Sequence, residues 1–408
     1  MSSKEIIVFQ VPEFPHISET FILKQIMFAI KLGYDVKILV RRELSRDKWL
    51  KSKDLDDFNL ADKIIIQDFR IPKKRLVRLI KWLWLLIQNL PQCIGLLKYH
   101  LLKSKFSLTW LYEWKFYKKL NNAHLFHIQY GTNKYPLDEL KLCGFRPKII
   151  CSFHGHDAVF PIHGFIENNC YYKNLFRSSH RIVVNTKYLE ELLIDLKCPK
   201  ELISRIPVSV DLNRFKPLEN KARSEIFQLI TVGRMHESKG HIYLLQTMKK
   251  LMRTDKSFNL KIIGEGPERQ KLENYITEHS LENLVELLGA KSQDEISILL
   301  RQSDVFLFSS IISEGLKLAT ETQGLAVNEA MASGLPVICF DTGGVKYNFE
   351  HLKSGFLVKE GDTEALTDYI LELFNSPDLL IQMGKSARQY AFDNFSDDYT
   401  LKKWQDLY

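Results

Sequence analysis

The stretch ETQGLAVNEAMASGLPVICF, residues 321–340, combines two acidic side chains with a helix start and a buried strand. Glu321 and Glu329 lie eight positions apart, with Gly324 between them and an alanine-rich run after them. The continuous apolar run VICF at 337–340 is typical of a buried strand. We therefore expect a carboxylate in a loop, a glycine turn, and a second carboxylate one turn into a helix.

This arrangement suits a ligand that carries both sugar hydroxyls and phosphates. Glu321 can accept hydrogen bonds from a hexose, and Glu329 from a ribose diol. Backbone amides at a helix start face an anion, and the helix dipole favours negative charge there. The pattern predicts a nucleotide-sugar site whose phosphate side is lined by the backbone of Gly324, Leu325, Ala326 and Val327.

The chain alternates short β-rich runs with helical stretches, which is typical of doubly wound parallel sheets in an α/β protein. Its 408 residues exceed one ordinary core, so we expect two domains. We place the first at 1–210 and the second at 211–385, with a C-terminal helix at 386–408 that returns to the first. Strands are predicted at 5–10, 35–40, 63–67, 125–130, 148–154 and 181–185, then at 227–233, 259–264, 285–289, 304–310, 335–340 and 355–358. Helices of the second half are predicted at 240–253, 267–279, 293–302, 327–333 and 363–375.

Cationic and glycine residues follow the predicted strands of the second half. Ligands of doubly wound sheets bind beyond the carboxyl ends of the strands, so these residues face the expected cleft. Arg234 and Lys239 can hold a diphosphate from two directions and stabilise the charge that develops on it; an exposed charged loop is the alternative. The further candidates for donor contacts are Gly233, Gly264, Gly266 and Lys291.

Two motifs of the first half also follow strands. His154 begins HGHD (154–157), where it can contact the transferred sugar or orient the acceptor, and Asp157 closes the motif. A metal site lacks further ligands, and a structural histidine is the other alternative. Ser18, Glu19 and Thr20 precede a helix from Phe21; they can cap it or contact the donor phosphate or acceptor.

Charge is distributed unevenly. Residues 1–210 hold 34 Lys and Arg against 20 Asp and Glu, and residues 70–119 hold 12 basic residues against one acid. Apolar residues interleave with these cations, which favours helices lying on an anionic membrane surface, interrupted near Pro91. The alternative is a pair of ordinary amphipathic helices with a solvated basic face. No recognised nucleic-acid motif is present, so we expect no nucleic-acid partner.

The remaining features exclude several classes of protein. The six scattered cysteines indicate reduced thiols in a cytosolic protein, and none has zinc spacing. The N-terminus lacks a signal core, and no apolar run is long enough to span a membrane. No acidic pair of the kind that holds Mg²⁺ with a diphosphate is evident, so we expect no metal and no other cofactor.

Together these motifs resemble glycosyltransferase family 4, a group of retaining enzymes with the GT-B fold. The resemblance rests on VGRMHESKG (232–240), IIGEGPERQKL (262–272) and EAMASGLPVICFDTGG (329–344), with the acidic pair at 321–329. FPHISETFI and SFHGHD are similar to colanic-acid and amylovoran type exopolysaccharide glycosyltransferases. The resemblance implies two Rossmann-like domains facing a central cleft and catalytic roles for His154, Arg234, Lys239 and Glu321.

The chain departs from the family pattern in three places. Ser18 and Glu19 replace a usual glycine pair, and Ser209 replaces a common linker glycine. The stretch 311–320 is longer than typical and contains SEG at 313–315, which mimics the start of the acidic motif; only Glu321 has the required offset.

The resemblance implies a retaining hexosyltransferase that uses a nucleotide sugar, with UDP favoured over GDP. The basic first half favours a lipid-linked saccharide acceptor in cell-surface polysaccharide synthesis, at the inner face of the plasma membrane. A nucleotide-sugar epimerase of the same fold and a non-catalytic peripheral membrane scaffold are the alternatives.

Overall fold

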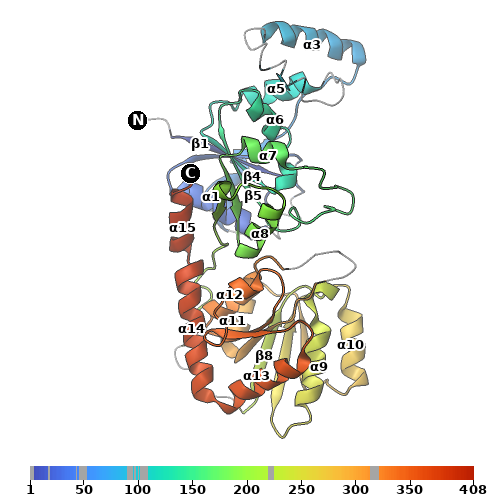
Figure 1. The fold of residues 1–408 in the computed structure, drawn as a ribbon, viewed down its shortest axis with the longest axis vertical. Coiled ribbons are helices and arrows are strands. Elements are labelled where there is room, and N and C mark those ends of the chain that lie inside the picture. The colour runs from blue at the N-terminus through green and yellow to red at the C-terminus, as the bar shows by residue number, and fades with distance from the viewer. Residues whose placement is uncertain are drawn as a thin grey trace. The chain divides into compact units, whose positions relative to one another are not determined.

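The computed structural model describes residues 4–16, 19–42, 44–45, 53–89, 95, 98–99, 101, 109–218, 225–312 and 321–408. The chain divides into two compact units, each built on one sheet (Figure 1). The first unit comprises Met1–Val184, Glu190–Arg205 and Trp404–Tyr408, and the second comprises Asn185–Leu189 and Ile206–Lys403.

The sheet of the first unit has seven parallel strands in the order β3-β2-β1-β4-β5-β6-β7. Its central strands are buried apolar runs, because helices cover both faces of a parallel sheet. β3 lies at one edge, and β2 separates it from β1. The strands are β1 (Ile6–Val11), β2 (Asp35–Val40), β3 (Ile64–Ile66), β4 (Leu125–Gln129), β5 (Lys148–Ser152), β6 (Arg181–Val184) and β7 (Ile203–Arg205).

The helices that accompany this sheet follow the strands in the chain. α1 buries Ile22, Leu23 and Ile26, three positions that recur at the spacing of one helical face. The helices are α1 (Thr20–Lys31), α2 (Lys53–Asp57), α3 (Arg75–Gln88), α5 (Trp110–Lys118), α6 (Leu137–Leu142), α7 (Lys173–Ser178) and α8 (Lys187–Asp195). The division between the units falls inside α8.

The sheet of the second unit has six parallel strands in the order β10-β9-β8-β11-β12-β13. Successive residues of each strand enter two different cores. In β8, Leu229 packs in one core and Ile230 in the other; in β12, Ile338 joins the core of Leu229 and Val337 that of Ile230. Both faces are therefore buried. The strands are β8 (Phe227–Val232), β9 (Phe258–Ile263), β10 (Val285–Gly289), β11 (Val305–Phe308), β12 (Val337–Phe340) and β13 (Gly355–Val358).

Two groups of helices cover these two faces. α9, α10 and α13 contribute to the core around Leu229, while α11, α12 and α14 contribute to the core around Ile230. The helices are α9 (His241–Leu251), α10 (Arg269–Glu278), α11 (Gln293–Gln302), α12 (Leu325–Ala332), α13 (Thr363–Asn375), α14 (Pro377–Phe395) and α15 (Asp397–Gln405).

The predicted fold class is confirmed, with two Rossmann-like parallel sheets, and every predicted strand is present within a few residues. β7 was missed because three residues, Ile203–Arg205, carry no periodic signal. The single helix predicted for 386–408 is wrong: α14 ends at Phe395, and α15 begins at Asp397 after Ser396 in an extended conformation. Trp404–Tyr408 belongs to the first unit.

Helix α3 is unusual because most of its apolar residues are exposed. Leu76, Ile80, Trp84 and Ile87 are 70, 59, 54 and 64% exposed, and Leu85 is the buried residue of the helix. These four positions follow one another at helical spacing, so they form an exposed apolar stripe along the helix. The second helix predicted after Pro91 lies largely outside the described residues. No helix among the described residues is long and apolar enough to cross a membrane.

Five cysteines lie in the described part of the chain, and all five are free thiols. Four of them, Cys143, Cys151, Cys198 and Cys339, are buried, while Cys170 is exposed. Burial raises the pKa of Cys151 and Cys339 well above the ordinary thiol value, so both remain protonated at neutral pH.

Candidate functional site

Lys239 and Glu321 meet at the carboxyl-terminal edge of the second sheet. The Lys239 ammonium donates a hydrogen bond to Oε2 of Glu321, although 82 positions separate the two residues. The Lys239 Nζ also lies 5.7 Å from the centre of the Phe308 ring, at the end of β11. The side chains are 21% and 26% exposed, so the ion pair is half-buried.

The loop after β8 positions Lys239 through its own backbone. A short 3₁₀ turn, Glu237–Lys239, is capped by His236, whose Nδ1 accepts a hydrogen bond from the Ser238 amide. The Lys239 carbonyl accepts from the Ser309 hydroxyl at 2.9 Å. At Gly240 (φ 60°) a Cβ would lie 2.1 Å from the Ser309 carbonyl oxygen, so only glycine allows the loop to approach β11 this closely.

The segment that carries Glu321 is held by residues that the sequence analysis did not identify. The Gly344 amide donates to the Glu321 carbonyl at 2.9 Å, and the Thr186 hydroxyl donates to the Thr322 carbonyl at 2.9 Å. The Gln323 side chain is buried and pairs with both backbone groups of Val208, accepting at 3.1 Å and donating at 3.2 Å. No sequence signal marks these contacts, because their partners are distant in the chain.

Helix α12 begins at Leu325, directly after Gly324, which has a φ of 67°. The amides of a first helical turn have no partner inside the helix, and here they belong to Leu325 and Ala326. The Val327 amide donates to the Gly324 carbonyl at 2.9 Å, and its side chain is buried in the core. Glu329 is half-buried on the second turn.

A neighbouring helical position was also missed by the sequence analysis. Asn328 lies directly before Glu329 and is fully buried. Among the described residues, none forms a hydrogen bond with its side-chain amide. A buried amide of this kind is a candidate partner for a polar ligand group.

Two glycines, Gly264 and Gly266, let the loops after β8 and β9 lie backbone against backbone. A Cβ at Gly264 would lie 1.9 Å from the Gly233 carbonyl oxygen, and a Cβ at Gly266 would lie 2.2 Å from the Met235 carbonyl oxygen. The Gly233 amide donates to Ile263 and the Met235 amide donates to Glu265, each at 2.9 Å. These loops form a continuous main-chain floor beside Lys239.

Arg234 and Lys291 lie on the loops that surround this floor. Arg234 is exposed on the loop after β8, which also carries Lys239. Lys291 follows β10, and its ammonium lies 3.5 Å from a carboxylate oxygen of Glu295 on α11. His241, the first residue of α9, is buried, and burial, followed by the charge of Lys239, lowers its pKa to about 4. It is therefore neutral at pH 7.

The first unit holds His154 in a polar cluster at the end of β5. Its Nε2 lies 2.9 Å from Oε1 of Gln129, so this nitrogen carries the proton. Burial lowers the pKa of His154 to about 4, and the nearby Asp157 opposes that shift only in part. Asp157 is fully buried; one carboxylate oxygen accepts from the His154 and Gly155 amides, at 3.0 and 2.9 Å, and the other from Gly131 at 2.8 Å. Asp157 thus fixes the turn that presents His154.

Glu19 reaches the same cluster through Tyr130. The Tyr130 hydroxyl donates to Glu19 at 2.7 Å, and its ring lies 4.7 Å from His154 and 4.9 Å from His156. Tyr130 has a φ of 68°, a strained value for a residue with a side chain. Burial raises the pKa of Glu19, which the Tyr130 hydrogen bond partly offsets. Thr20 is the exposed first residue of α1.

Some predicted features cannot be placed. Ser18 and the stretch 313–320, including SEG at 313–315, lie outside the described residues. Within the described residues, no group of three His, Cys, Asp or Glu side chains could hold a metal ion.

A second buried histidine lies under the first-unit cluster. His127 on β4 is fully buried between the Ser152 hydroxyl, at 2.7 Å, and the Tyr408 hydroxyl, at 3.0 Å. Burial lowers its pKa to about 3, with a further contribution from His154. The sequence analysis missed this contact because Tyr408 lies far away in the chain.

The sequence is similar to known glycosyltransferases. Residues 213–390 match the model of glycosyl transferases group 1. The chain is 28% identical to the amylovoran biosynthesis glycosyltransferase AmsK of Erwinia amylovora, over 98% of both chains. It is 28% identical to the putative colanic acid biosynthesis glycosyltransferase WcaL of Escherichia coli K12, over 94% of both.

Solved structures share the fold at low sequence identity. Anabaena HepE, solved in complex with UDP and glucose, gives a TM-score of 0.71 at 16% identity over 99% of both chains. A sucrose-phosphate synthase from Thermosynechococcus elongatus gives 0.70 at 16% identity, over 99% of this chain and 98% of that one. The resemblance seen in the motifs is confirmed: residues 213–390 match the model of glycosyl transferases group 1, both curated relatives along nearly the whole chain are glycosyltransferases, and the fold is GT-B.

Proposed function

We propose that this glycosyltransferase moves a hexose from a nucleotide sugar, UDP-linked in preference to GDP-linked, to a lipid-linked saccharide in cell-surface polysaccharide synthesis. The relatives AmsK and WcaL are named for amylovoran and colanic acid biosynthesis, which supports a role in exopolysaccharide assembly. HepE was solved with UDP and glucose, which supports the choice of base and sugar class.

The observation that carries the proposal is the contact between Lys239 and Glu321. It places an ammonium and a carboxylate side by side at the strand ends, next to a glycine floor and the start of α12. A nucleotide sugar offers the complementary groups in the same order, because its diphosphate pairs with a cation and its hexose hydroxyls donate to a carboxylate. We assign Lys239 and Arg234 to the diphosphate, Glu321 to the hexose and Glu329 to the ribose.

Bond breaking between the sugar and the diphosphate leaves negative charge on the phosphate. The Lys239 ammonium and the first amides of α12 are fixed before the reaction, so they can stabilise that charge without reorganisation. We propose retention of configuration by front-face displacement, in which the departing phosphate oxygen accepts the proton of the acceptor hydroxyl. No carboxylate nucleophile is then needed, in contrast to retaining glycosidases. We also propose that the protein cations make a metal ion unnecessary.

In the first unit we assign sugar contacts to His154 and Glu19. His154 is neutral at pH 7 because burial lowers its pKa to about 4, so it serves as a hydrogen-bonding group and not as a charge. Gln129 fixes its ring at 2.9 Å, and Asp157 fixes its backbone. We therefore treat Asp157 as a positioning residue. Thr20, the first residue of α1, is proposed at the same side of the unit.

We propose that the enzyme is peripheral on the inner face of the plasma membrane. The exposed apolar stripe of α3, Leu76, Ile80, Trp84 and Ile87, supports this location, since a helix with an unpartnered apolar face and flanking cations suits an interface. The 14 residues of α3 correspond to about 21 Å, so the helix would lie on the surface. Sedimentation with anionic vesicles should succeed at low salt and weaken as salt rises; no sedimentation at low salt contradicts the location.

Thermal unfolding and product analysis test the proposed reaction. UDP should raise the melting temperature more than GDP, because a ligand that binds only the folded state stabilises it by mass action. A panel of UDP-sugars with a lipid-linked oligosaccharide extract should then release UDP only when an acceptor is present. Conversion of a free nucleotide sugar into its epimer without acceptor would instead indicate an epimerase, and no response to any nucleotide would indicate a scaffold.

A further inference from the structure

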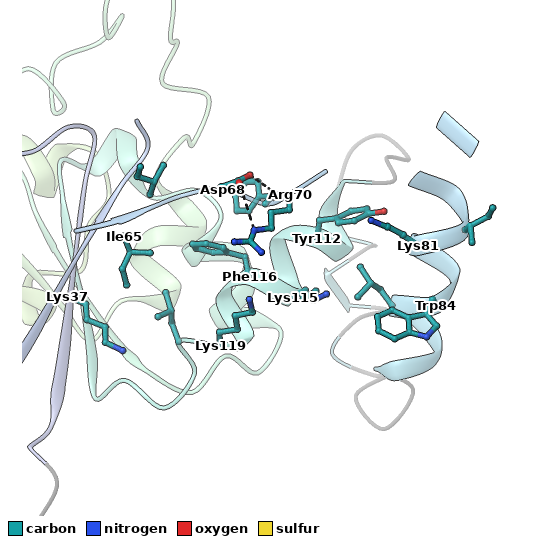
Figure 2. Close-up of a pocket in the computed structure, with 15 residues that line it drawn as sticks. Lys37, Ile65, Asp68, Arg70, Lys81, Trp84, Tyr112, Lys115, Phe116 and Lys119 are labelled. Atoms are coloured by element: carbon teal, nitrogen blue, oxygen red, sulfur yellow. Dashed lines mark hydrogen bonds and ion pairs between the residues drawn. The ribbon is translucent and has the colours of Figure 1, made fainter. Parts of the chain in front are cut away.

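A pocket of about 870 Å³ lies in the first unit, between the edge strand β3 and helices α3 and α5 (Figure 2). Its volume falls within the range typical of small-molecule sites, about 300–1,000 Å³. β3 contributes Ile65 and Ile66, α5 contributes Phe116, and α3 contributes Ile80 and Trp84. None of these residues belongs to the proposed donor site, which lies in the other unit.

The lining is strongly cationic. Lys37, Lys81, Lys115 and Lys119 all line the pocket; Figure 2 shows Lys81 and Lys115 between α5 and α3, and Lys37 and Lys119 nearer the sheet. Among the described residues of the lining, Asp68 is the only acid.

The single acid does not balance these lysines. The Arg70 amide donates to Asp68 at 2.8 Å, and the Arg70 guanidinium pairs with it at 4.0 Å. In the described part of the chain, Lys37, Lys81 and Lys119 form no ion pair, and Lys115 lies 5.8 Å from the centre of the Trp84 ring. Four positive charges therefore face one site without a carboxylate partner, which favours an anion of high charge density.

The apolar side of the pocket continues onto the exposed stripe of α3. Ile80 and Trp84 belong both to the lining and to the stripe, so they connect the pocket with the surface that we propose to face the membrane. Helix α5 holds α3 in place. The Tyr112 hydroxyl donates to the Arg78 carbonyl at 2.8 Å, and the Trp82 and Trp110 rings meet edge to face. α3 thus lines the pocket with the cation of Lys81 and with the apolar side chains of Ile80 and Trp84, which continue to the protein surface.

We propose that this pocket binds a membrane lipid with an anionic phosphate headgroup, one lipid per protein, with the phosphate on the lysines and the first chain carbons along Ile80 and Trp84. Charge complementarity selects this occupant: a free phosphate would leave the apolar wall uncovered, and a zwitterionic lipid would bring a competing cation. The inference deepens the proposed membrane location by replacing a diffuse charged surface with a discrete site. Lipid binding is independent of sugar transfer.

The test is calorimetric titration of the full chain with monomeric dihexanoylphosphatidic acid, below its micelle concentration. We expect saturable binding near one to one. Dihexanoylphosphatidylcholine and inorganic phosphate should each bind at least tenfold more weakly. Equal binding of the phosphatidylcholine would overturn the headgroup assignment, and equal binding of inorganic phosphate would overturn the lipid assignment. Stoichiometry well above one would overturn the discrete site.

Matched variants distinguish lipid binding in the pocket from general attraction between the basic protein and an anionic lipid. Lys115→Ala/Lys119→Ala should weaken phosphatidic acid binding at least tenfold, whereas Lys73→Ala/Lys74→Ala, which removes the same charge from exposed positions outside the lining, should change it less than twofold. Equal losses refute the proposal. If the first double variant does not fold, Lys81→Ala against Lys74→Ala repeats the comparison on α3. UDP-induced stabilisation, measured in each variant, reports the donor site separately.

Discussion

Replacement of Lys239 by alanine removes the ammonium that contacts Glu321 without changing the core. The Lys239 side chain is half-buried on a loop, and the contacts that shape the loop come from its backbone, through Ser309 and Gly240. The loop should therefore keep its conformation. The variant tests the charge and not the fold.

Two magnitudes follow from this geometry. A partly solvated ion pair contributes about 1 kcal/mol or less to folding, which corresponds to a fall in Tm of about 2–4 °C for a unit of this size. A hydrogen bond to a charged diphosphate contributes about 1.5–3 kcal/mol, so the Kd for UDP should rise about 10- to 150-fold. Loss of one preorganised donor to the transition state should lower turnover by roughly 10²-fold or more.

The assay compares Lys239→Ala with Lys250→Ala. Lys250 on α9 pairs with Glu364 and donates to Thr363 at 2.9 Å, in the same unit but in a different part of it. Both variants should lose similar stability in thermal melts, whereas only Lys239→Ala should lose UDP affinity and UDP release. If Lys239→Ala transfers sugar at the parental rate, the diphosphate assignment is wrong.

Other perturbations address the support of the site. Gln323→Ala leaves both backbone groups of Val208 without their partner and should lower the free energy of unfolding by about 2–3 kcal/mol, measured by urea denaturation; an unchanged midpoint would contradict this role. Gly266→Ala brings a Cβ within 2.2 Å of the Met235 carbonyl oxygen and should lower the free energy of unfolding by about 1–3 kcal/mol. It should also weaken UDP binding. Parental UDP affinity in this variant would refute the role of the main-chain floor. The pKa of His127 is about 3 in the folded chain and about 6.5 when unfolded, so its contribution is present above pH 6.5 and lost as the pH falls. His127 should account for up to about 2 kcal/mol of the stability that is lost between pH 6.5 and 5, and His127→Gln should reduce the slope by that share, while His154 and His241 keep theirs; an equal slope in the variant would exclude His127. EDTA should leave turnover unchanged, and restoration of lost activity by Mg²⁺ would overturn the metal-free proposal.

The two parallel sheets and the convergence of Lys239 and Glu321 were accessible from the sequence for one reason. Parallel strands place their carboxyl ends at one edge, so residues that follow different strands converge whatever their separation in the chain. Lys239 follows β8 and Glu321 follows β11, and their contact was implied by that rule. β2 was predicted with its observed bounds because its β-rich run VKILV contains no glycine or proline and follows the turn residue Gly33.

The missed features depend on contacts that leave no local pattern. Thr186 bonds the Thr322 carbonyl and Tyr408 bonds His127, and neither pair has a spacing that a periodicity could reveal. The break between α14 and α15 follows from Ser396, whose hydroxyl accepts from the Tyr399 amide at 3.3 Å, a cap within an otherwise helical stretch. The basic segment predicted a surface helix, but the pocket behind α3 needs β3 and α5 as well.

The main-chain floor formed by the loops after β8 and β9 limits which positions can change the donor preference of the proposed site, in evolution or in engineering. Its contacts join main-chain atoms of Gly264 and Gly266 to those of Gly233 and Met235, so no side chain there can be altered by degrees. A main-chain surface of this kind offers no side chain that could distinguish one sugar from another. In the proposed donor site, changes of donor preference must therefore arise at side chains, and libraries for altered sugar use should leave Gly264 and Gly266 untouched.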